Sequence, residues 1–264
     1  MNLKASFDKY EYYQKSVQHP GGDADFIEKA YFEARAKRPR ILREDFCAGF
    51  ALCCEWVRRD PGNQAIGVDL DPEPVEYGTA HYLSTLTQDQ KSRVRIILNN
   101  VLNPELPTAD VIAALNFSYY GFKKRTDLLQ YFKACRHALG SSGLLVLDCF
   151  GGSDLNGANE AETVHDDFSY FWDQENFNPI THEAMFHIHF KRKGEKKRMS
   201  VFTYDWRVWT IPELRDLMEE AGFKESRVYW EGTDEDGDGN GEFVRSEIGE
   251  EGCESWVAYI VGLA

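Results

Sequence analysis

The sequence has no uncharged stretch long enough to cross a membrane, and no apolar signal-peptide region in its opening residues, MNLKASFDKYEYYQKSV. We therefore expect no membrane partner and predict a cytoplasmic protein. Basic residues are also few, since 30 lysines and arginines stand against 44 aspartates and glutamates, a net charge of −14. Because such a surface repels phosphate groups, nucleic acid is not an expected partner either.

Metal-binding and disulfide patterns are missing as well. The six cysteines show no C-x-x-C spacing and lie in apolar surroundings, which predicts reduced, buried thiols. His187 and His189 lie two residues apart on an expected strand, a spacing that is compatible with a metal ligand pair. His182-Glu183 begins like the zinc motif H-E-x-x-H, but position 186 is Phe. We predict no metal site.

Two charged segments have alternative interpretations. Asp234-x-Asp236-x-Asp238-Gly239 begins like a calcium loop, yet the twelfth position is Arg245, so an acidic surface loop is favoured. The basic residues of 191–198 are the one candidate for a local basic groove. A charged turn between two strands is the favoured interpretation of that segment.

Helix and strand patterns alternate through the first 150 residues. Apolar runs predict strands at residues 41–45, 64–70, 94–98, 110–115 and 143–150, and helical spacing of apolar residues predicts helices at 25–37, 51–59, 72–85 and 127–139. Such alternation predicts a parallel sheet covered by helices on both faces. It is typical of the α/β class.

The pattern changes after Phe150. Residues 182–190 and 199–206 read as two antiparallel strands joined by a polar turn around Gly194. A capping box at Thr210-Ile-Pro-Glu213 opens a helix that stops at Gly222, and strands at 228–230 and 256–261 complete the sheet. We predict one domain over residues 1–264.

Polar or small residues follow each predicted parallel strand. They are Glu44-Asp45 with Ala48 and Gly49, then Asp69, then Asn99-Asn100, then Asn116 to Tyr120. Ligands of open parallel sheets bind beyond the carboxyl ends of the strands. Small residues let a backbone approach a ligand, and the Asp69 carboxylate can accept both hydroxyls of a ribose, although it can equally cap the next helix. We therefore predict a nucleoside site there.

This order of motifs resembles the class I S-adenosylmethionine-dependent methyltransferases, and more narrowly a bacterial subgroup with the pattern L-R-E-D-F-C-G-T. The pattern stands here at residues 42–49, and the resemblance also covers 13–18, 67–71, 116–118 and 204–209. It implies a Rossmann-like α/β sandwich whose mostly parallel, seven-stranded sheet has an antiparallel last strand, plus an inserted β-hairpin. It also implies S-adenosylmethionine as cofactor.

The resemblance also implies which residues contact the cofactor. They are Tyr13, Glu44, Asp45, Phe46, Cys47, Ala48, Gly49, Asp69, Leu70, Asn100, Val101, Asn116 and Phe117. Glu44 or Asp45 and the turn that follows would face the methionine moiety. Asp69 would hold the ribose, Asn100 and Val101 the adenine, and Asn116 the sulfonium side.

One departure from the family pattern concerns the turn after the first strand. Phe46, Ala48 and Phe50 occupy the three glycine positions of the usual G-x-G-x-G. Phe50 is bulky enough to narrow the pocket. A dinucleotide-dependent dehydrogenase is disfavoured, because its first turn uses three glycines and this one offers one.

Methyl transfer to a nucleophile needs alignment more than it needs a catalytic triad, and the sequence shows no triad. Asn116-Phe-Ser-Tyr119 loosely resembles the N-P-P-Y loop of amino-methyltransferases, which gives a weak preference for N-methylation. The resemblance makes Asn116, Tyr119 and Tyr120 the candidate catalytic residues. Tyr204, Trp206 and Arg207 are candidates for contact with the acceptor, although the aromatic residues can equally be core.

These observations predict a methyltransferase that acts on a small molecule. Residues 1–38 would form an N-terminal helical lid, or merely pack on the sheet, and residues 151–207 an inserted cover over the acceptor. A protein methyltransferase, a non-catalytic cofactor-binding protein and an interaction module remain alternatives. The oligomeric state and the identity of the acceptor are left open.

Overall fold

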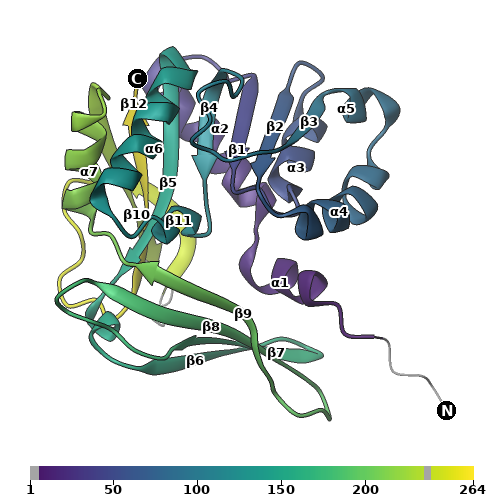
Figure 1. The fold of residues 1–264 in the computed structure, drawn as a ribbon, viewed down its shortest axis with the longest axis vertical. Coiled ribbons are helices and arrows are strands. Elements are labelled where there is room, and N and C mark those ends of the chain that lie inside the picture. Colours follow the sequence, from purple (N-terminus) through teal and green to yellow (C-terminus); the bar gives the residue numbers. More distant parts are fainter. Residues whose placement is uncertain (1–5, 235–238) are drawn as a thin grey trace.

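The computed structural model describes residues 6–234 and 239–264 (Figure 1). Its main sheet has eight strands in the order β11-β10-β12-β5-β4-β1-β2-β3. The bounds are β1 Ile41–Asp45, β2 Gln64–Asp69, β3 Val94–Leu98, β4 Ala109–Ala114, β5 Leu139–Gly151, β10 Glu225–Thr233, β11 Gly239–Arg245 and β12 Trp256–Leu263. Strands β3, β2, β1, β4 and β5 run parallel, whereas β12 lies antiparallel between β5 and β10. The predicted mostly parallel sheet with an antiparallel last strand is confirmed.

An eighth strand, β11, extends the sheet beyond the seven that were expected. It pairs antiparallel with β10 and comes from the segment interpreted as an acidic surface loop. Its sequence, GNGEFVR, has little apolar alternation, because most of its side chains are exposed. The pairing with β10 therefore decides its conformation, and local sequence does not.

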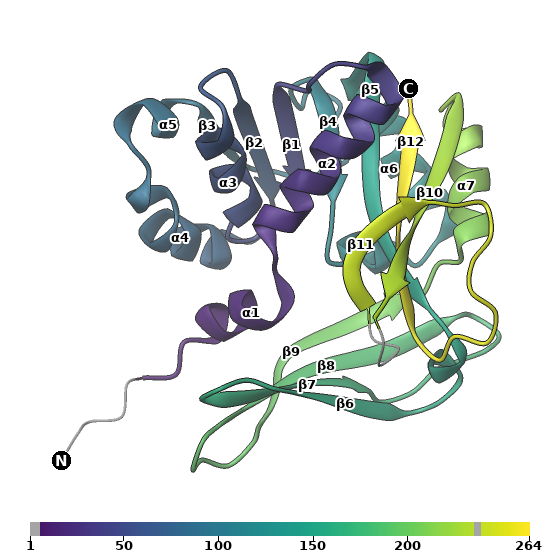
Figure 2. The ribbon, with the colours of Figure 1, turned by 180° about the vertical axis from the view of Figure 1, so that it is seen from behind.

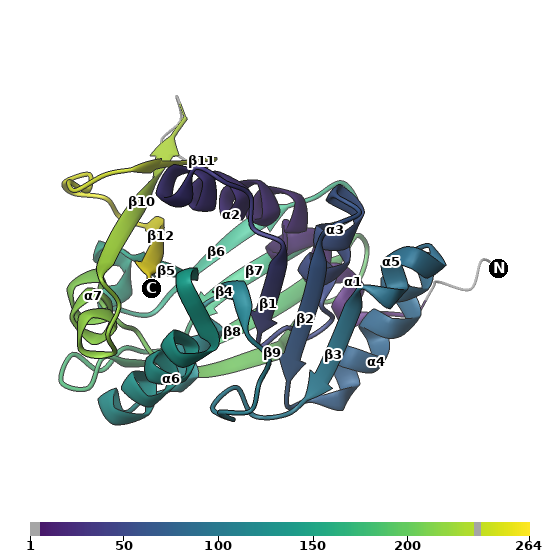
Figure 3. The same cartoon turned by 90° about the horizontal axis from the view of Figure 1, so that it is seen from above.

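Helices cover both faces of the sheet (Figures 2 and 3). The helices are α1 Lys9–Val17, α2 Pro20–Arg35, α3 Ala51–Arg59, α4 Pro72–His81, α5 Gln88–Ser92, α6 Arg125–Ala138 and α7 Ile211–Glu220, with short 3₁₀ turns η1 Leu83–Thr85, η2 Ser118–Gly121 and η3 Ser153–Asn156. Helices α2 and α3 pack on one face, and α6 and α7 on the other. None of the helices in the described residues is long and apolar enough to cross a bilayer.

The central strands are apolar on both faces. In β4, Val111 and Ala113 pack with α2 and α3, and Ile112 and Ala114 pack with α6 and α7. Successive side chains of a strand point to opposite faces, so a strand covered on both sides must be apolar throughout. This explains why an unbroken apolar run identified the strand.

A second, antiparallel sheet lies across the end of the main sheet at which the parallel strands finish (Figure 1). It consists of β6 Asn159–Val164, β7 Phe168–Gln174, β8 Glu183–Arg192 and β9 Arg198–Arg207, paired in that order. The predicted hairpin is β8 and β9, and the charged turn between them is confirmed. Strands β6 and β7 were not predicted. All of β6 is exposed and its sequence has no alternating pattern, and in β7 the buried residues do not alternate with exposed ones.

Helix α1 joins the second sheet to the main domain. Tyr12 packs against Phe168 with ring centroids 4.8 Å apart, and Lys9 pairs with Glu73 of α4 at 2.7 Å. The N-terminal segment therefore spans from the second sheet to the helix that follows β2. This position is compatible with the predicted N-terminal lid.

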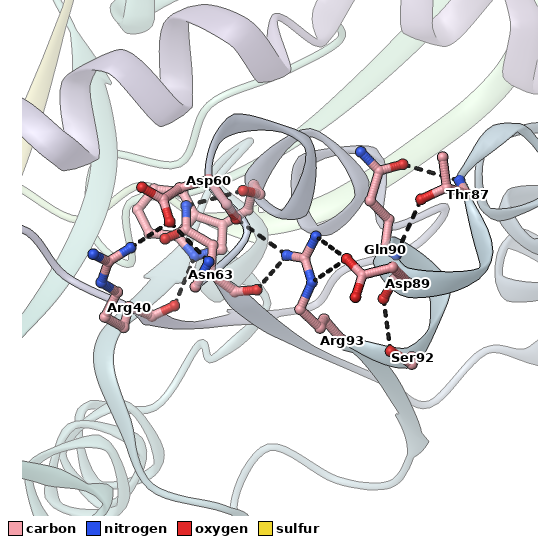
Figure 4. Close-up of polar contacts among 10 residues, drawn as sticks. Arg40, Asp60, Asn63, Thr87, Asp89, Gln90, Ser92 and Arg93 are labelled. Atoms are coloured by element: carbon pink, nitrogen blue, oxygen red, sulfur yellow. Dashed lines mark hydrogen bonds and ion pairs between the residues drawn. The ribbon is translucent and has the colours of Figure 1, made fainter.

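The opposite end of the sheet is held by a separate polar network (Figure 4). The Arg93 guanidinium donates to the backbone carbonyls of Asp60 and Asn63 and to the Asp89 carboxylate at 2.6 to 3.2 Å. These bonds join the start of β3 to the loop before β2. They are structural and far from the strand ends where a ligand site was predicted.

The predicted burial of the cysteines holds for five of the six. All six are free; five are buried and Cys253 is partly exposed.

Candidate functional site

The turn after β1 keeps the shape of a glycine turn without glycine at its key positions. Phe46, Ala48 and Phe50 have φ of 58°, 44° and 48°, in the left-handed region that favours glycine. For a residue with a Cβ atom, that region costs about 1 to 2 kcal/mol. Such strain persists only where the surrounding structure imposes it, and it gathers at functional sites.

Hydrogen bonds from neighbouring strands hold this turn in place. The Cys47 amide donates to the Val68 carbonyl at 3.1 Å, and the Ala48 amide donates to Oδ2 of Asp69 at 2.7 Å. The Phe50 amide closes the turn on the Cys47 carbonyl at 2.6 Å. Strand β2 therefore imposes the strained conformation on the residues after β1.

Phe50 lies beneath the turn. Its side chain is fully buried in the cluster formed with α2 and α3. A Cβ atom at Gly78 of α4 would lie 2.7 Å from the Phe50 ring, so the ring packs against α4 at that glycine. It lines neither of the two cavities described below.

Glu44 and Asp45 point to opposite faces of the sheet. The buried Glu44 carboxylate accepts the Cys53 amide at 3.1 Å, in the first turn of α3, whose N-cap Phe50 has no capping side chain. Burial raises the pKa of Glu44 to about 8, and the Cys53 hydrogen bond only partly offsets that rise.

Asp45 does not contribute to the site in the way that the resemblance implied. It is buried on the α6 side, where it pairs with Arg43 at 2.9 Å and accepts a hydrogen bond from Tyr131 at 3.0 Å. The alternation of a strand sends adjacent side chains to opposite faces, so only one of the two acids can face the turn. That residue is Glu44.

Asp69 connects two strand ends. Oδ2 accepts the Ala48 amide and Oδ1 accepts the Asp71 amide at 2.9 Å. Helix α4 is capped by Asp71, whose side chain accepts the Glu73 amide, so Asp69 is not the helix cap. Each Asp69 oxygen keeps a second lone pair for a ligand hydroxyl.

The residues after Asp69 and after β3 complete this part of the site. Leu70 is 68% exposed, and Asn100 is exposed with its side chain accepting the Leu102 amide at 2.9 Å. Val101 is buried. These residues follow β2 and β3, which are neighbours in the sheet.

Asn116 and Phe117, after β4, also have left-handed backbones, both with φ of 55°. Their amides donate to the two oxygens of one carboxylate, that of Asp148 on β5, at 2.6 and 2.9 Å. Burial raises the pKa of Asp148 to about 7. Sequence reasoning missed Asp148, although it too is an acid near the end of an apolar strand.

Tyr119 and Tyr120 lie in the core, contrary to their assignment as candidate catalytic residues. Both are fully buried in η2, and their hydroxyls donate to the backbone carbonyls of Asp148 at 2.7 Å and Trp209 at 3.4 Å. The 3₁₀ turn directs them inward under β9. Tyr120 also packs against Phe117 with ring centroids 5.9 Å apart, and neither tyrosine lines a cavity.

Two adjoining cavities open beside Asn116. The acidic cavity, of about 870 Å³, has Asp23, Asp148 and Glu231 among its walls, with Phe26, Phe243 and Tyr259. The aromatic pocket, of about 240 Å³, is lined by Tyr13, Phe117, Phe150, Tyr170, Trp172, Tyr204 and Trp206. Val17, Asn116, Phe117 and Val257 line both, so the two cavities meet there.

Of the three residues expected to contact the acceptor, Tyr204 and Trp206 line the aromatic pocket and Arg207 does not. The Arg207 guanidinium lies 3.7 Å from the centre of the Trp209 ring and donates to Glu213 at 2.9 Å. It points to the opposite face of β9 from Trp206 because the two are adjacent on the strand. Its role here is structural.

One cluster has the composition of a metal site, namely Glu160, Asp173 and His189. Nδ1 of His189 accepts the Ser200 amide at 2.7 Å, so the ring proton of the neutral imidazole is on Nε2, which lies 3.1 Å from Asp173. Nε2 is thus a hydrogen-bond donor without a free lone pair for a metal. Asp236 and Asp238 of the calcium-like segment lie outside the described residues.

No protein-family model and no curated protein matches the chain by sequence. Solved structures do match. A S-adenosylmethionine-dependent methyltransferase from Clostridium acetobutylicum ATCC 824 has a TM-score of 0.68 at 16% identity, over 95% of this chain and 96% of that one.

Two further structures cover the whole of this chain. CalS10, an amino pentose methyltransferase from Micromonospora echinaspora with S-adenosylmethionine bound, has a TM-score of 0.67 at 14% identity, over all of its own length. KedS8, a sugar N-methyltransferase from Streptoalloteichus, has a TM-score of 0.64 at 15% sequence identity, over 95% of its own length. The chain has the class I methyltransferase fold. The shared fold includes the second sheet, since the matches extend over nearly the entire chain.

Proposed function

We propose that the protein is a methyltransferase that uses S-adenosylmethionine to methylate a small molecule. The observation that carries this proposal is the placement of four neighbouring strand ends at one edge of the sheet: the strained turn after β1, Asp69 at the end of β2, Asn100 after β3 and Asn116 after β4. Membership of the L-R-E-D-F-C-G-T subgroup is part of the proposal and rests on residues 42–49.

The residues present fit the cofactor. S-adenosylmethionine carries a sulfonium and an ammonium, and Glu44, Asp23 and Asp148 are carboxyls whose pKa burial raises. Electrostatic repulsion from Asp23 contributes to the raised pKa of Glu44 and to that of Asp148. A bound cation would relieve that repulsion, so the cluster is suited to a positively charged ligand.

Within this proposal the chain's residues hold and align the reactants. Asp69 would accept hydrogen bonds from the ribose hydroxyls, while Glu44 and the turn at Cys47–Gly49 would face the methionine part. Asn100 and Val101 would border the adenine. The cofactor supplies an activated methyl group, and the protein contributes mainly by holding the acceptor in line with it.

Several observations favour a small acceptor. The aromatic pocket lies between the second sheet and Asn116, beside α1, so residues 151–207 and the N-terminal segment would cover it. CalS10 is named an amino pentose methyltransferase and KedS8 a sugar N-methyltransferase. We extend this kind of acceptor to the present chain, together with the location in the cytoplasm expected from its composition.

Isothermal titration with S-adenosylmethionine and S-adenosylhomocysteine tests the cofactor. We expect both to bind. An absence of heat with either ligand would leave only a role as an interaction module.

A further inference from the structure

Five carboxyl groups line the acidic cavity, and one of them, Asp25, pairs with Arg59 at 2.6 Å. Three of the others, Asp23, Asp148 and Glu231, are bonded to uncharged donors. Asp23 accepts the Tyr259 hydroxyl at 2.8 Å, and Glu231 accepts the Gly241 amide at 3.0 Å. Asp148 accepts two backbone amides. Among the described residues, none of the three has a lysine, arginine or histidine nitrogen within 4.0 Å.

The basic residues near this cavity do not neutralise it. Lys29 lines the cavity and contributes one positive charge, but its ammonium donates to the Phe243 carbonyl at 2.6 Å and not to a carboxylate of the cavity. His19 also lines it, and only weakly favours ionisation of Asp23. Elsewhere acids are paired, as Glu213 is with Arg207. Because five carboxyl groups outnumber Lys29 and the one arginine paired with Asp25, the cavity keeps an excess of negative charge, which attracts cations.

The adjoining pocket suits a cation with an apolar body. Tyr204 and Trp206 stack with ring centroids 4.4 Å apart, and Trp172 lies 6.1 Å from Trp206. Aromatic faces attract ammonium groups and pack well against alkyl groups. A molecule across the junction at Asn116 would thus meet aromatic rings on one side and carboxylates on the other.

We infer that the acceptor is a primary or secondary amine that binds as its ammonium form, and that Asp148 receives its proton. This inference rests on the proposed function and specifies its substrate class. Asp148 is bonded to the backbone of Asn116 and Phe117, the residues where the two cavities meet. Its carboxylate is held without a cation, so it is free to pair with one.

The chemistry requires such a group, because an ammonium nitrogen has no lone pair for attack. Its proton moves to an oxygen of Asp148, and the freed lone pair forms the bond from nitrogen to the methyl carbon. The bond from sulfur to that carbon breaks, and sulfur keeps the electron pair. The products are the N-methylated amine, which carries the positive charge as an ammonium, neutral S-adenosylhomocysteine and protonated Asp148, which then loses its proton to water.

The environment of Asp148 agrees with this role. Burial raises its pKa to about 7, where a carboxyl group both accepts and releases protons near neutrality. The titratable groups that interact electrostatically with Asp148 are Asp23 from α2, Tyr13 from α1, Tyr119 and Tyr120 from η2, Cys149 from β5, and Tyr259 from β12. They are a carboxylic acid, phenols and a thiol, so none of them supplies a positive charge to pair with Asp148.

The first test uses methyl-labelled S-adenosylmethionine with separate panels of amines, alcohols, carboxylic acids and thiols, and with a metabolite extract. We expect label on nitrogen. Label on oxygen, sulfur or carbon, or no labelled amine at all while S-adenosylhomocysteine still binds by calorimetry, would overturn the inference. Failure of S-adenosylhomocysteine to bind would instead overturn the proposed function, so the two failures are distinguishable.

The second test uses the labelled amine and Asp148→Asn. We expect kcat/KM for the amine, measured at saturating cofactor, to fall about 100-fold and the rise of the rate near pH 7 to flatten, while calorimetry still detects binding of S-adenosylhomocysteine. Glu162→Gln, on exposed strand β6, removes an acid outside both cavities and is the matched charge control. A normal rate and pH profile in Asp148→Asn would refute the role of Asp148.

A third variant keeps the inference testable if Asp148→Asn does not fold. Glu231→Gln removes a negative charge from the cavity wall. We expect the KM for the amine to rise several-fold with kcat little changed. An unchanged KM would refute binding of the acceptor as a cation.

Discussion

Oδ2 of Asp69 accepts the backbone amide of Ala48 at 2.7 Å, which ties the end of β2 to the left-handed turn after β1. The same carboxylate is thus both a brace for the turn and the expected ligand of the ribose. Its substitution should reveal both roles.

Asp69→Ala should weaken binding of S-adenosylmethionine and S-adenosylhomocysteine by at least about 10-fold, since one lost hydrogen bond to a charged group corresponds to about 1.5 to 3 kcal/mol. Calorimetry measures both affinities. Asp71→Ala, which removes only the cap of α4, is the control and should cost stability without this loss. Equal affinity of Asp69→Ala and the parent would refute the ribose contact.

Ala48→Gly should stabilise the protein. Glycine adopts a φ of 44° without the clash of a Cβ atom. The free energy gained by relieving this clash exceeds the entropic cost of ordering glycine, so the free energy of unfolding should rise by about 0.5 to 1 kcal/mol. Thermal unfolding without ligand measures the effect. Ala51→Gly, in the first turn of α3, should instead lower the stability. A destabilised Ala48→Gly would show that the methyl group contributes more by packing than it costs by strain.

Tyr119→Phe should separate a structural role from a catalytic one. The hydroxyl donates to the Asp148 carbonyl in a fully buried position, so its loss should lower the free energy of unfolding by about 1 to 2 kcal/mol. Because Tyr119 does not reach either cavity, kcat/KM should stay within about 3-fold. A large loss of kcat in folded protein would contradict this placement.

The affinity for S-adenosylmethionine should rise with pH. A cation prefers ionised carboxyls, and burial raises the pKa of Glu44 to about 8 and of Asp148 to about 7. Binding should therefore strengthen from about pH 6 to 8. S-adenosylhomocysteine lacks the sulfonium and should show a smaller rise. Calorimetry at several pH values compares them, and identical slopes would contradict the role of these carboxyls.

The stability of the unliganded protein should change in the opposite direction. Glu44 binds a proton more tightly when folded, with a pKa of about 8 against 4.5 for the ordinary group. The unfolded state thus binds fewer protons between these values, and the free energy of unfolding should fall as pH rises through that window. Glu44→Gln should make the fall shallower. Denaturant unfolding at a series of pH values measures it, and an unchanged slope in Glu44→Gln would refute the assignment.

Much of the main sheet followed from local sequence. The apolar runs of β4 and β5 and the periodicity of α3 and α6 are set by burial on both faces, which a strand or helix records in its own residues. The polar residues predicted to follow β1, β2 and β4 do lie at the carboxyl ends of these parallel strands.

Other features depend on partners distant in sequence. Helix α2 begins at Pro20, before its recognisable apolar stripe, because its Gly-Gly segment resembles a break in the helix. Strands β6 and β11 are exposed, so they form by pairing with β7 and β10 without an apolar pattern of their own.

The sequence by itself determined the α/β architecture and placed the candidate residues at the carboxyl ends of the parallel strands, because burial periodicity and strand-end residues are local properties. Only the tertiary structure decided that Asp148 supports Asn116, that Tyr119 and Tyr120 turn into the core, and that Arg207 packs on Trp209. Those outcomes depend on side-chain directions at contacts between segments far apart in the chain. Such directions follow from packing, which no single stretch of sequence encodes.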